Sequence, residues 1–186
     1  FKEAARKADP VLLEPMMAIN YAHLVMLRAQ GIVSAADAHL LREALDAVSQ
    51  DEIRGVTYDG TYEDLFFYVE RLVIQACGDD VAGRLHTGRS RNDIDMTMYR
   101  IYQRELVLGL LAGTFALRRS LLDLIDRHRD TVLVLHTHTQ RAQPSTVAHY
   151  LLAVVEQLDR DRRRLEAALE TTNRNPLGAC AITGTG

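Results

Sequence analysis

Apolar residues recur every three or four positions along most of the chain, which is the spacing of amphipathic α-helices. The first such stretch follows Asp9-Pro10 and ends at Gly31, a residue type that tolerates the backbone conformation of helix ends. Residues 55–60 are expected to form a turn or a short hairpin. One predicted helix precedes this turn, and another follows it and ends at Gly78. That preceding helix is expected to be capped by Ser34 and to carry one apolar face made of Leu41, Ala44, Leu45 and Val48.

The second half of the chain predicts two long helices. One runs from about Asp93 to Arg129 without a proline, which corresponds to about 55 Å at 1.5 Å per residue. The other has Pro144 in its first turn and ends at about Thr172. Residues 132–143 between them are expected to form a loop or a short extended segment. Helices of this length bury their faces in extended bundles or between subunits.

The predicted fold class is therefore all-α. We expect a small N-terminal helical domain over residues 1–91 and the first part of a central long-helix bundle over residues 92–186. The sequence starts at Phe1 and stops shortly after a loop opens, so we expect a fragment of a longer subunit.

The composition is typical of a soluble protein with an apolar core, with 47% hydrophobic and 25% charged residues. The net charge of -3 gives no support for binding to nucleic acid or to an anionic membrane. Cys77 and Cys180 lie far apart, so they suggest neither a disulfide framework nor a metal site, and a cytoplasmic location fits best. An apolar run of about 20 residues, as a membrane span requires, does not occur.

Residues 86–93, His-Thr-Gly-Arg-Ser-Arg-Asn-Asp, gather polar side chains directly before the first long helix, and we call them the first polar segment. The free N–H groups of that helix can be capped by Ser90, Asn92 or Asp93. A helix N-terminus favours negative charge, and Arg89 or Arg91 can add a forked, bidentate grip on a carboxylate or phosphate. The alternative is a well-capped helix with solvated arginines.

Residues 136–144, His-Thr-His-Thr-Gln-Arg-Ala-Gln-Pro, repeat this arrangement before the second long helix, and we call them the second polar segment. His138 can transfer a proton near neutral pH, although a lone histidine is more often structural. His136 and His138 can also be interpreted as a metal pair, but no third ligand is evident and no metal is expected. Two such segments at equivalent helix starts predict convergence on one polar pocket.

In order along the chain, these residues resemble argininosuccinate lyase of the aspartase/fumarase superfamily. The resemblance covers nearly the whole chain, with weaker matches at Ala22-His23 and Glu63-Asp64-Leu65, and it is carried by residues 85–93, Thr137-His138, residues 140–144 and Pro176-Leu177-Gly178. It implies an all-α subunit of a homotetramer, active sites built from loops of three subunits, a small-molecule substrate and no cofactor.

The resemblance implies reversible β-elimination of fumarate from an N-substituted L-aspartate. By that resemblance, Ser90, Arg91 and Asn92 bind the succinyl part of the substrate. Thr137 and His138 are the catalytic candidates: Thr137 contacts a carboxylate and His138 assists proton transfer, while Gln140 orders the second segment. The family's flexible signature loop, Gly-Ser-Ser-x-Met-Pro-x-Lys-x-Asn-Pro, supplies the serine base, and it does not occur in these residues. The fragment alone is therefore expected to be inactive.

Three departures from the family pattern fall on the amine side of the substrate. Phe66 and Phe67 replace a histidine and a threonine, Ile19-Asn20 replaces Gly-Ser, and Ile94 replaces the glutamine after Asn92-Asp93. Loss of hydrogen-bonding groups there disfavours a guanidinium, because an unpaired desolvated polar group costs about 1–3 kcal/mol. The sequence thus predicts an amine other than arginine, handled by Asn20, Phe66 and Phe67, as in ethylenediamine-disuccinate lyase.

The sequence leaves other functions open. Ordinary argininosuccinate lyase is the first alternative, and an inactive helical structural homologue is the second, because fold alone does not prove activity. A basic nucleic-acid module is disfavoured by the acidic net charge and by an aromatic content of only 6%. Lyases of the same superfamily that act on malate, aspartate or adenylosuccinate differ in the second polar segment and rank low.

Overall fold

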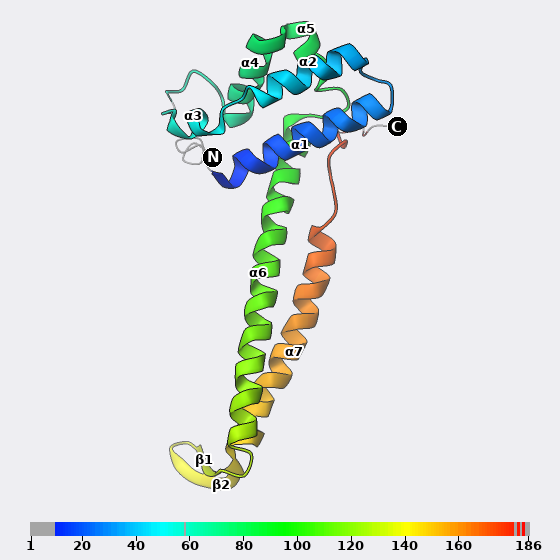
Figure 1. Ribbon diagram of the computed structural model, residues 1–186. Coiled ribbons are helices and arrows are strands. Elements are labelled where there is room, and N and C mark those ends of the chain that lie inside the picture. Colours follow the sequence, from blue (N-terminus) through cyan, green and yellow to red (C-terminus); the bar gives the residue numbers. More distant parts are fainter. Residues whose placement is uncertain (1–9, 58, 181, 183, 185–186) are drawn as a thin grey trace. The chain divides into compact units, whose positions relative to one another are not determined.

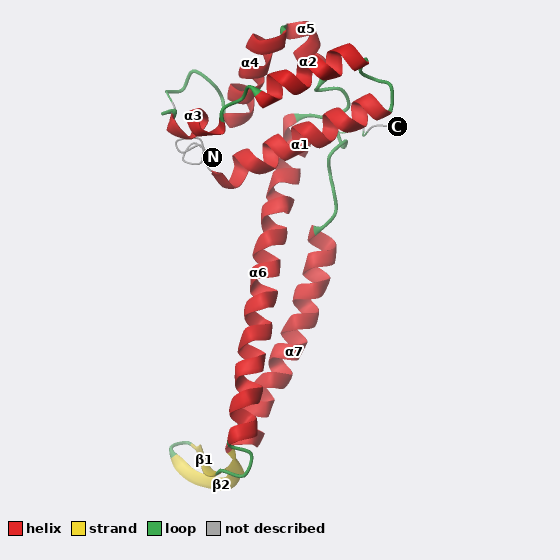
Figure 2. Ribbon diagram, viewed as in Figure 1, coloured by secondary structure: helices red, strands yellow, loops and turns green. Residues whose placement is uncertain are grey.

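The computed structural model describes residues 10–57, 59–180, 182 and 184. Helices make up most of this part of the chain (Figure 1), and two short strands form a hairpin (Figure 2). The predicted all-α class is confirmed, and no helix in the described ranges is long and apolar enough to cross a membrane. The elements are α1 (Pro10–Ala29), α2 (Ala35–Asp46), α3 (Gln50–Gly55), α4 (Leu65–Cys77), α5 (Asp79–Arg84), α6 (Arg91–Arg127), β1 (Val132–Thr137), β2 (Gln140–Thr146) and α7 (Val147–Thr172).

The chain divides into two compact units. Unit 1 comprises Phe1–Tyr102 together with Asn175–Gly186, and unit 2 comprises Gln103–Arg174. Helix α6 therefore begins in unit 1 and continues into unit 2. The predicted domain boundary between residues 91 and 92 falls at the start of α6, and it stays a prediction for the complete subunit.

Unit 1 has one apolar core, built mainly by α1, α2 and α4. Helix α2 contributes the predicted face, with Leu41, Ala44 and Leu45 buried. Fully burying one large apolar side chain contributes about 1.5–3 kcal/mol, so this periodic burial is what holds the short helices together. The most deeply buried side chains of the described residues are Leu13, Met16, Leu27, Val33, Leu41, Leu45, Ile53 and Ile94.

Local capping explains where the helices of unit 1 begin and end. Ser34 caps α2 as predicted, because its Oγ accepts the Asp37 N–H at 3.1 Å. Gly78 ends α4 as predicted, with a left-handed φ of 82°. Asp64 caps the start of α4, and its Oδ1 accepts the N–H groups of Phe66 and Phe67 at 3.0 and 3.3 Å.

Two short helices were not predicted from the sequence. Helix α3 has six residues and ends at Gly55, where the sequence predicts the start of a turn. Helix α5 also has six residues and follows Gly78 directly. Elements of this length contain fewer than two helical turns, so they leave no apolar periodicity to detect.

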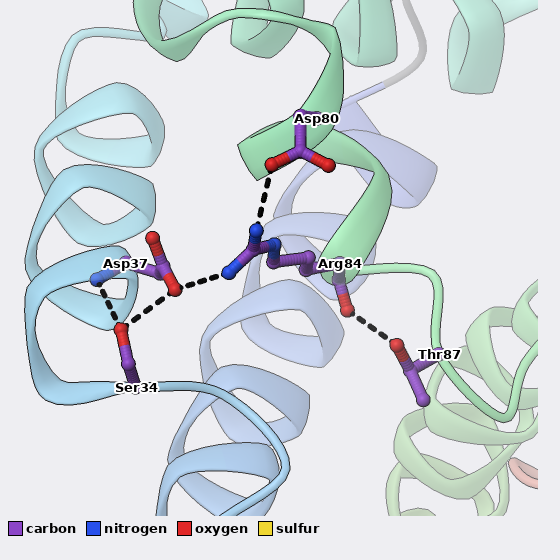
Figure 3. A network of polar contacts seen from close by, with 5 residues as sticks. All are labelled: Ser34, Asp37, Asp80, Arg84 and Thr87. Carbon is purple, nitrogen blue, oxygen red and sulfur yellow. Dashed lines mark hydrogen bonds and ion pairs between the residues drawn. The ribbon is translucent and has the colours of Figure 1, made fainter.

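A polar network joins α2, α5 and the first polar segment (Figure 3). Arg84, the last residue of α5, donates hydrogen bonds to the carboxylates of Asp37 and Asp80. Asp37 also accepts the Ser34 hydroxyl at 2.6 Å, and the Thr87 hydroxyl donates to the Arg84 carbonyl at 2.8 Å. Exposed ion pairs contribute little stability one by one, so the consequence of this network is mainly the fixed position of residue 87 against α5.

Unit 2 contains the antiparallel β1–β2 hairpin, which lies between the long helices in the chain (Figure 1). The extended conformation predicted within residues 132–143 is present, but the predicted place of Pro144 is wrong. Pro144 pairs with Val134 in β2, and α7 begins only at Val147. Thr146 provides the reason, because its hydroxyl accepts the His149 N–H at 3.1 Å and caps α7 there, while a two-stranded ladder tolerates proline at its edge.

The long helices of unit 2 expose much apolar surface. Leu111 and Val155 are buried, but many other large apolar side chains of α6 and α7 are exposed, among them Leu106, Leu108, Leu110, Phe115, Leu117, Tyr150, Leu152 and Val154. Long helices with many exposed apolar side chains are typical of helices that pack against further helices.

Candidate active site

The first polar segment follows a series of tight turns between α5 and α6. The N–H groups of Leu85, His86 and Thr87 donate to carbonyls three residues earlier at 3.1, 3.0 and 3.2 Å. Gly88 has a φ of 73°, in the left-handed region that favours glycine. The buried ring of His23, on α1, lies with Nε2 2.9 Å from the Thr87 carbonyl oxygen and donates to it. The segment is therefore ordered by contacts within unit 1.

The start of α6 is capped by a side chain inside the helix. Ser90 is the residue before the helix, and its carbonyl accepts the first helical bond, from the Ile94 N–H at 3.2 Å. Asp93 is buried, and its Oδ1 accepts the Ser90 N–H at 2.8 Å. This contact is one half of a capping box, in which an acidic side chain in the first turn reaches back to the N-cap residue. Ser90, Asn92 and Asp93 were the predicted capping residues, and the side chain that makes a capping hydrogen bond is that of Asp93.

The two arginines of the segment have different environments. Arg89 is only 5% exposed, and its guanidinium nitrogens have no hydrogen-bond partner among the described residues. The side chain lines a cavity of about 10 Å³ with Glu70 and His86, enough space for about one water molecule. Burial lowers the pKa of Arg89 to about 10, against the opposing effect of the nearby charges of Asp93 and Glu70. Arg91 is therefore the arginine available to a ligand.

Arg91 is oriented by two carboxylates at the start of α4. Its Nη1 donates to Glu63 Oε1 at 2.6 Å and to Asp64 Oδ2 at 2.8 Å. The hydrogen bond to Glu63, followed by the charge of Asp64, raises the pKa of Arg91. The guanidinium carbon also lies 5.7 Å from the centroid of the Phe67 ring. Since Asp64 is held by its capping bonds and Glu63 is largely exposed, one of the two carboxylates can exchange with a ligand.

Ser90, Arg91 and Asn92 thus stand together at the N-terminus of a helix of 37 residues. The Ser90 side chain is half-buried and Asn92 is exposed. A hydroxyl, a guanidinium and an amide at the positive end of a helix can bind a carboxylate and can stabilise negative charge that develops on it.

The three residues predicted on the amine side lie in two environments. Asn20 and Phe66 are 6% and 9% exposed, and both line the cavity that contains Arg89. Phe66 packs edge-on against the rings of Phe67 and His86, with centroids 5.3 and 5.4 Å apart. Only Phe67 is half-buried beside Arg91. Within unit 1, Asn20 and Phe66 are packing residues of the interior.

The second polar segment forms the tip of the β1–β2 hairpin. Thr137 and Gln140 are paired across the ladder, so His138 and Thr139 make a two-residue turn. Both turn residues have positive φ, 47° and 66°, as a type I′ turn requires, although Asn-Gly is the favoured sequence there. Every residue from 136 to 144 is exposed, and the Thr139 hydroxyl donates to the His138 carbonyl at 2.6 Å.

The structure brings Ser90, Arg91 and Asn92 together in unit 1, and it brings Thr137, His138 and Gln140 together in unit 2. The two groups belong to different units, so the predicted convergence of the two segments stays a prediction. Among the described residues, no group of three or more histidine, cysteine or acidic side chains is placed to hold a metal ion.

Three acidic residues near Arg91 were not predicted as part of the site. Glu63 and Asp64 contact its guanidinium, and Asp95 is half-buried nearby. Burial, and next the charge of Asp64, raises the pKa of the Asp95 carboxyl. Of these three residues, Asp64 could have been found from the sequence, because it stands directly before an apolar helical stretch, as an N-cap residue does.

Comparisons with known proteins match this architecture. A family described as Lyase matches residues 18–186. Argininosuccinate lyase of Methanosarcina acetivorans is 39% identical over 183 residues, which cover 98% of this chain and 37% of that protein. Argininosuccinate lyase 2 of Agrobacterium fabrum is 43% identical over 169 residues, covering 90% of this chain and 34% of that protein.

Among solved structures, the crystal structure of EDDS lyase in complex with formate superposes with a TM-score of 0.82 at 34% identity, covering 95% of this chain and 34% of that one. The helical fold and the polar start of α6 define a lyase of the aspartase/fumarase type. The chain belongs to the lyase family, in its argininosuccinate lyase-like branch. It spans about a third of the length of the relatives that it matches.

Proposed function

We propose that the complete protein is a carbon–nitrogen lyase that releases fumarate from an N-substituted L-aspartate, and that this substrate is argininosuccinate. The observation that carries the proposal is the ordered donor set of Ser90, Arg91 and Asn92 at the start of α6, in a chain of the lyase family. An inactive structural homologue has no need of a charged arginine held in place by two acidic side chains.

The chemistry explains why these residue types are needed. A base removes the proton beside one carboxylate, and negative charge accumulates on that carboxylate before the C–N bond breaks. Fixed donors stabilise such charge because they need no reorganisation when it forms. In our proposal Ser90, Arg91 and Asn92 bind the succinyl part, Thr137 contacts a carboxylate, His138 assists proton transfer and Gln140 orders the hairpin around them. Proton transfer and anion stabilisation suffice for this reaction, so the proposal includes no cofactor.

A homotetramer with shared active sites is part of the proposal. The exposed apolar side chains along α6 and α7 support it, because such faces are covered when long helices assemble in bundles. We also propose a cytoplasmic location, because the proposed activity is that of an enzyme of small-molecule metabolism.

The choice of amine departs from the expectation raised by the sequence. Relatives at 38–43% identity carry the name argininosuccinate lyase, whereas the EDDS lyase structure is 34% identical. The burial of Asn20 and Phe66 inside unit 1 also weakens the argument that they form a new amine pocket. Phe67, half-buried beside Arg91, is the observation that keeps a diamine substrate as the second candidate.

Fumarate absorbance in the ultraviolet tests both candidates on the complete protein. Argininosuccinate and ethylenediamine-disuccinate are supplied side by side, and we expect fumarate from argininosuccinate. Fumarate from the diamine substrate alone would overturn the choice of amine. Fumarate from neither would count against both named substrates, and the F67T variant then shows whether the side chain beside Arg91 excludes argininosuccinate.

A further inference from the structure

Asp93 makes contacts that its capping role does not explain. While Oδ1 accepts the Ser90 N–H, Oδ2 accepts the N–H groups of Gly178 at 3.0 Å and Cys180 at 2.8 Å. One carboxylate, 4% exposed, therefore binds three backbone N–H groups from two segments of unit 1 that lie far apart in the sequence.

A carboxylate is the side chain that this junction requires. Buried backbone N–H groups must find an acceptor, and an ionised carboxylate has several acceptor sites on its two oxygens and no donor. Hydrogen bonds from N–H groups to a charged oxygen are roughly twice as strong as neutral ones. An asparagine would present its NH₂ group to one set of N–H donors, so that donors would face a donor.

A second tie lies one turn further along α6. The buried hydroxyl of Thr97 donates to the Asp93 carbonyl at 2.6 Å and also meets Asn175 Oδ1 at 3.5 Å. The same Asn175 oxygen accepts the Leu177 N–H at 2.9 Å. Residues 175–180 are thus fastened to the first two turns of α6 through Asp93, Thr97 and Asn175.

The buried guanidinium of Arg89 adds an electrostatic reason for this placement. Arg89 lies in the turn directly before the helix, without a hydrogen-bond partner among the described residues, and Asp93 is the nearby acidic group with the largest effect on it. A buried positive charge is tolerated only beside a compensating negative one. The charge of Asp93, followed by that of Glu70, favours the charged form of Arg89, and the same Asp93 carboxylate holds Ser90 and anchors residues 178–180.

We propose that Asp93 is a positioning residue, which fixes the Ser90–Arg91–Asn92 donor set by clamping the start of α6 to residues 175–180. This inference rests on the proposed function. Asp93 itself is buried, and both of its carboxylate oxygens accept backbone N–H groups. Its effect is on the angle and depth at which the hydroxyl, guanidinium and amide are presented, and a misplacement of about 1 Å can cost as much as 10²-fold in rate.

The test uses the complete protein with D93N and, as a matched control, D79N, which neutralises an exposed aspartate on α5 of the same unit. Amide hydrogen exchange of residues 88–93 and 175–180 is measured together with the KM and kcat for fumarate release. We expect D93N to speed exchange in both segments at once and to raise KM about tenfold, because the donor set binds the succinyl part of the substrate. The kcat should fall as well, because the same donors stabilise the charge that develops on the carboxylate. D79N should change none of these.

Exchange that rises in only one segment, or KM that stays unchanged while both segments loosen, would overturn the proposal. If D93N does not fold, D93E keeps the charge but moves the carboxylate by one methylene away from the Ser90, Gly178 and Cys180 N–H groups. Unchanged exchange and KM in that variant would overturn the clamp. A wild-type protein that releases no fumarate would refute the proposed function, while the exchange comparison would still decide whether the clamp exists.

Discussion

The two polar segments look alike in sequence but differ in how the structure holds them. The first segment is fixed from within unit 1 by the ring of His23, the carboxylate of Asp93 and the acidic pair at the start of α4. The second segment is a hairpin tip, and residues 136–144 are exposed throughout.

This difference shows which half of the proposed site is preorganised by this chain alone. Donors that are already fixed avoid the loss of conformational freedom on binding, so the first segment can act as a rigid carboxylate grip. An exposed hairpin reaches the same precision only when other surfaces of the assembled protein pack around it. The proposed tetramer supplies such surfaces.

The largest expected effect is on the second segment. In the complete protein, H138N should lower kcat about 10²- to 10⁴-fold, the usual contribution of a positioned proton-transfer group, with little change in KM. His136, also exposed, lies two residues earlier in β1, so H136N is the matched control and should leave kcat nearly unchanged. Steady-state fumarate release measures both variants. An unchanged kcat in H138N would remove this histidine from the mechanism.

The corresponding change in the first segment should affect binding. R91A removes a charged donor at the start of α6, and kcat/KM should fall about 10- to 150-fold, equivalent to about 1.5–3 kcal/mol. The melting temperature should change little, because Glu63 is largely exposed and Asp64 keeps its capping bonds to the N–H groups of α4 when Arg91 is removed. R42A, which breaks an exposed ion pair of α2, is the control. Loss of the folded assembly in R91A alone would show that this arginine is structural.

Much of this fold follows from local patterns in the sequence. Ser34 and Gly78 marked helix ends, and the spacing of Leu41, Ala44 and Leu45 marked a buried face, because capping and periodicity act over a few residues. Helix α3 and the place of Pro144 were missed for the same reason. The first is too short to show a period, and at the second the cap of Thr146 outweighs the preference of proline for a first turn.

The donor residues of the candidate site could be predicted from the sequence, but the residues that hold them in place could not. Ser90, Arg91 and Asn92 precede an apolar periodic stretch, which is a local signal. Nothing local distinguishes Arg89 from Arg91, because the burial of Arg89 depends on packing by α1, α4 and α5. The contacts of Asp93 with residues 178 and 180 join segments that the sequence separates widely.

The internal supports of the first segment should make unit 1 sensitive to acid. Burial, followed by the charge of Arg89, lowers the pKa of His86 from 6.5 to about 4. The unfolded chain therefore takes up a proton as the pH falls through about 6.5, while the folded chain does so only near 4, and stability present at neutral pH is lost across that window. Full loss would be about 3 kcal/mol, and the raised pKa of Glu70, 3.1 Å from His86, offsets part of it.

Urea unfolding of the complete protein at about pH 7 and about pH 5 measures this loss. H86Q, whose side chain stays neutral, should flatten the pH dependence, whereas H39Q, at a largely exposed histidine of α2, should not. Equal pH dependence in wild type and H86Q would mean that His86 does not limit the acid stability.

The smallest expected effect concerns the hairpin turn. Thr139 is β-branched and has a φ of 66°, a conformation that costs an ordinary residue about 1–2 kcal/mol, so T139G should relieve strain. Part of the gain is lost because glycine is more flexible in the unfolded chain, which leaves about 0.5–1 kcal/mol and a slowing of amide exchange at residues 136–141 by about two- to fivefold. T131G is the control, because Thr131 is an exposed threonine outside the positive-φ region, and glycine there should speed exchange. Faster exchange in T139G would show that the turn is unstrained, and His138 would then be presented by an ordinary flexible tip.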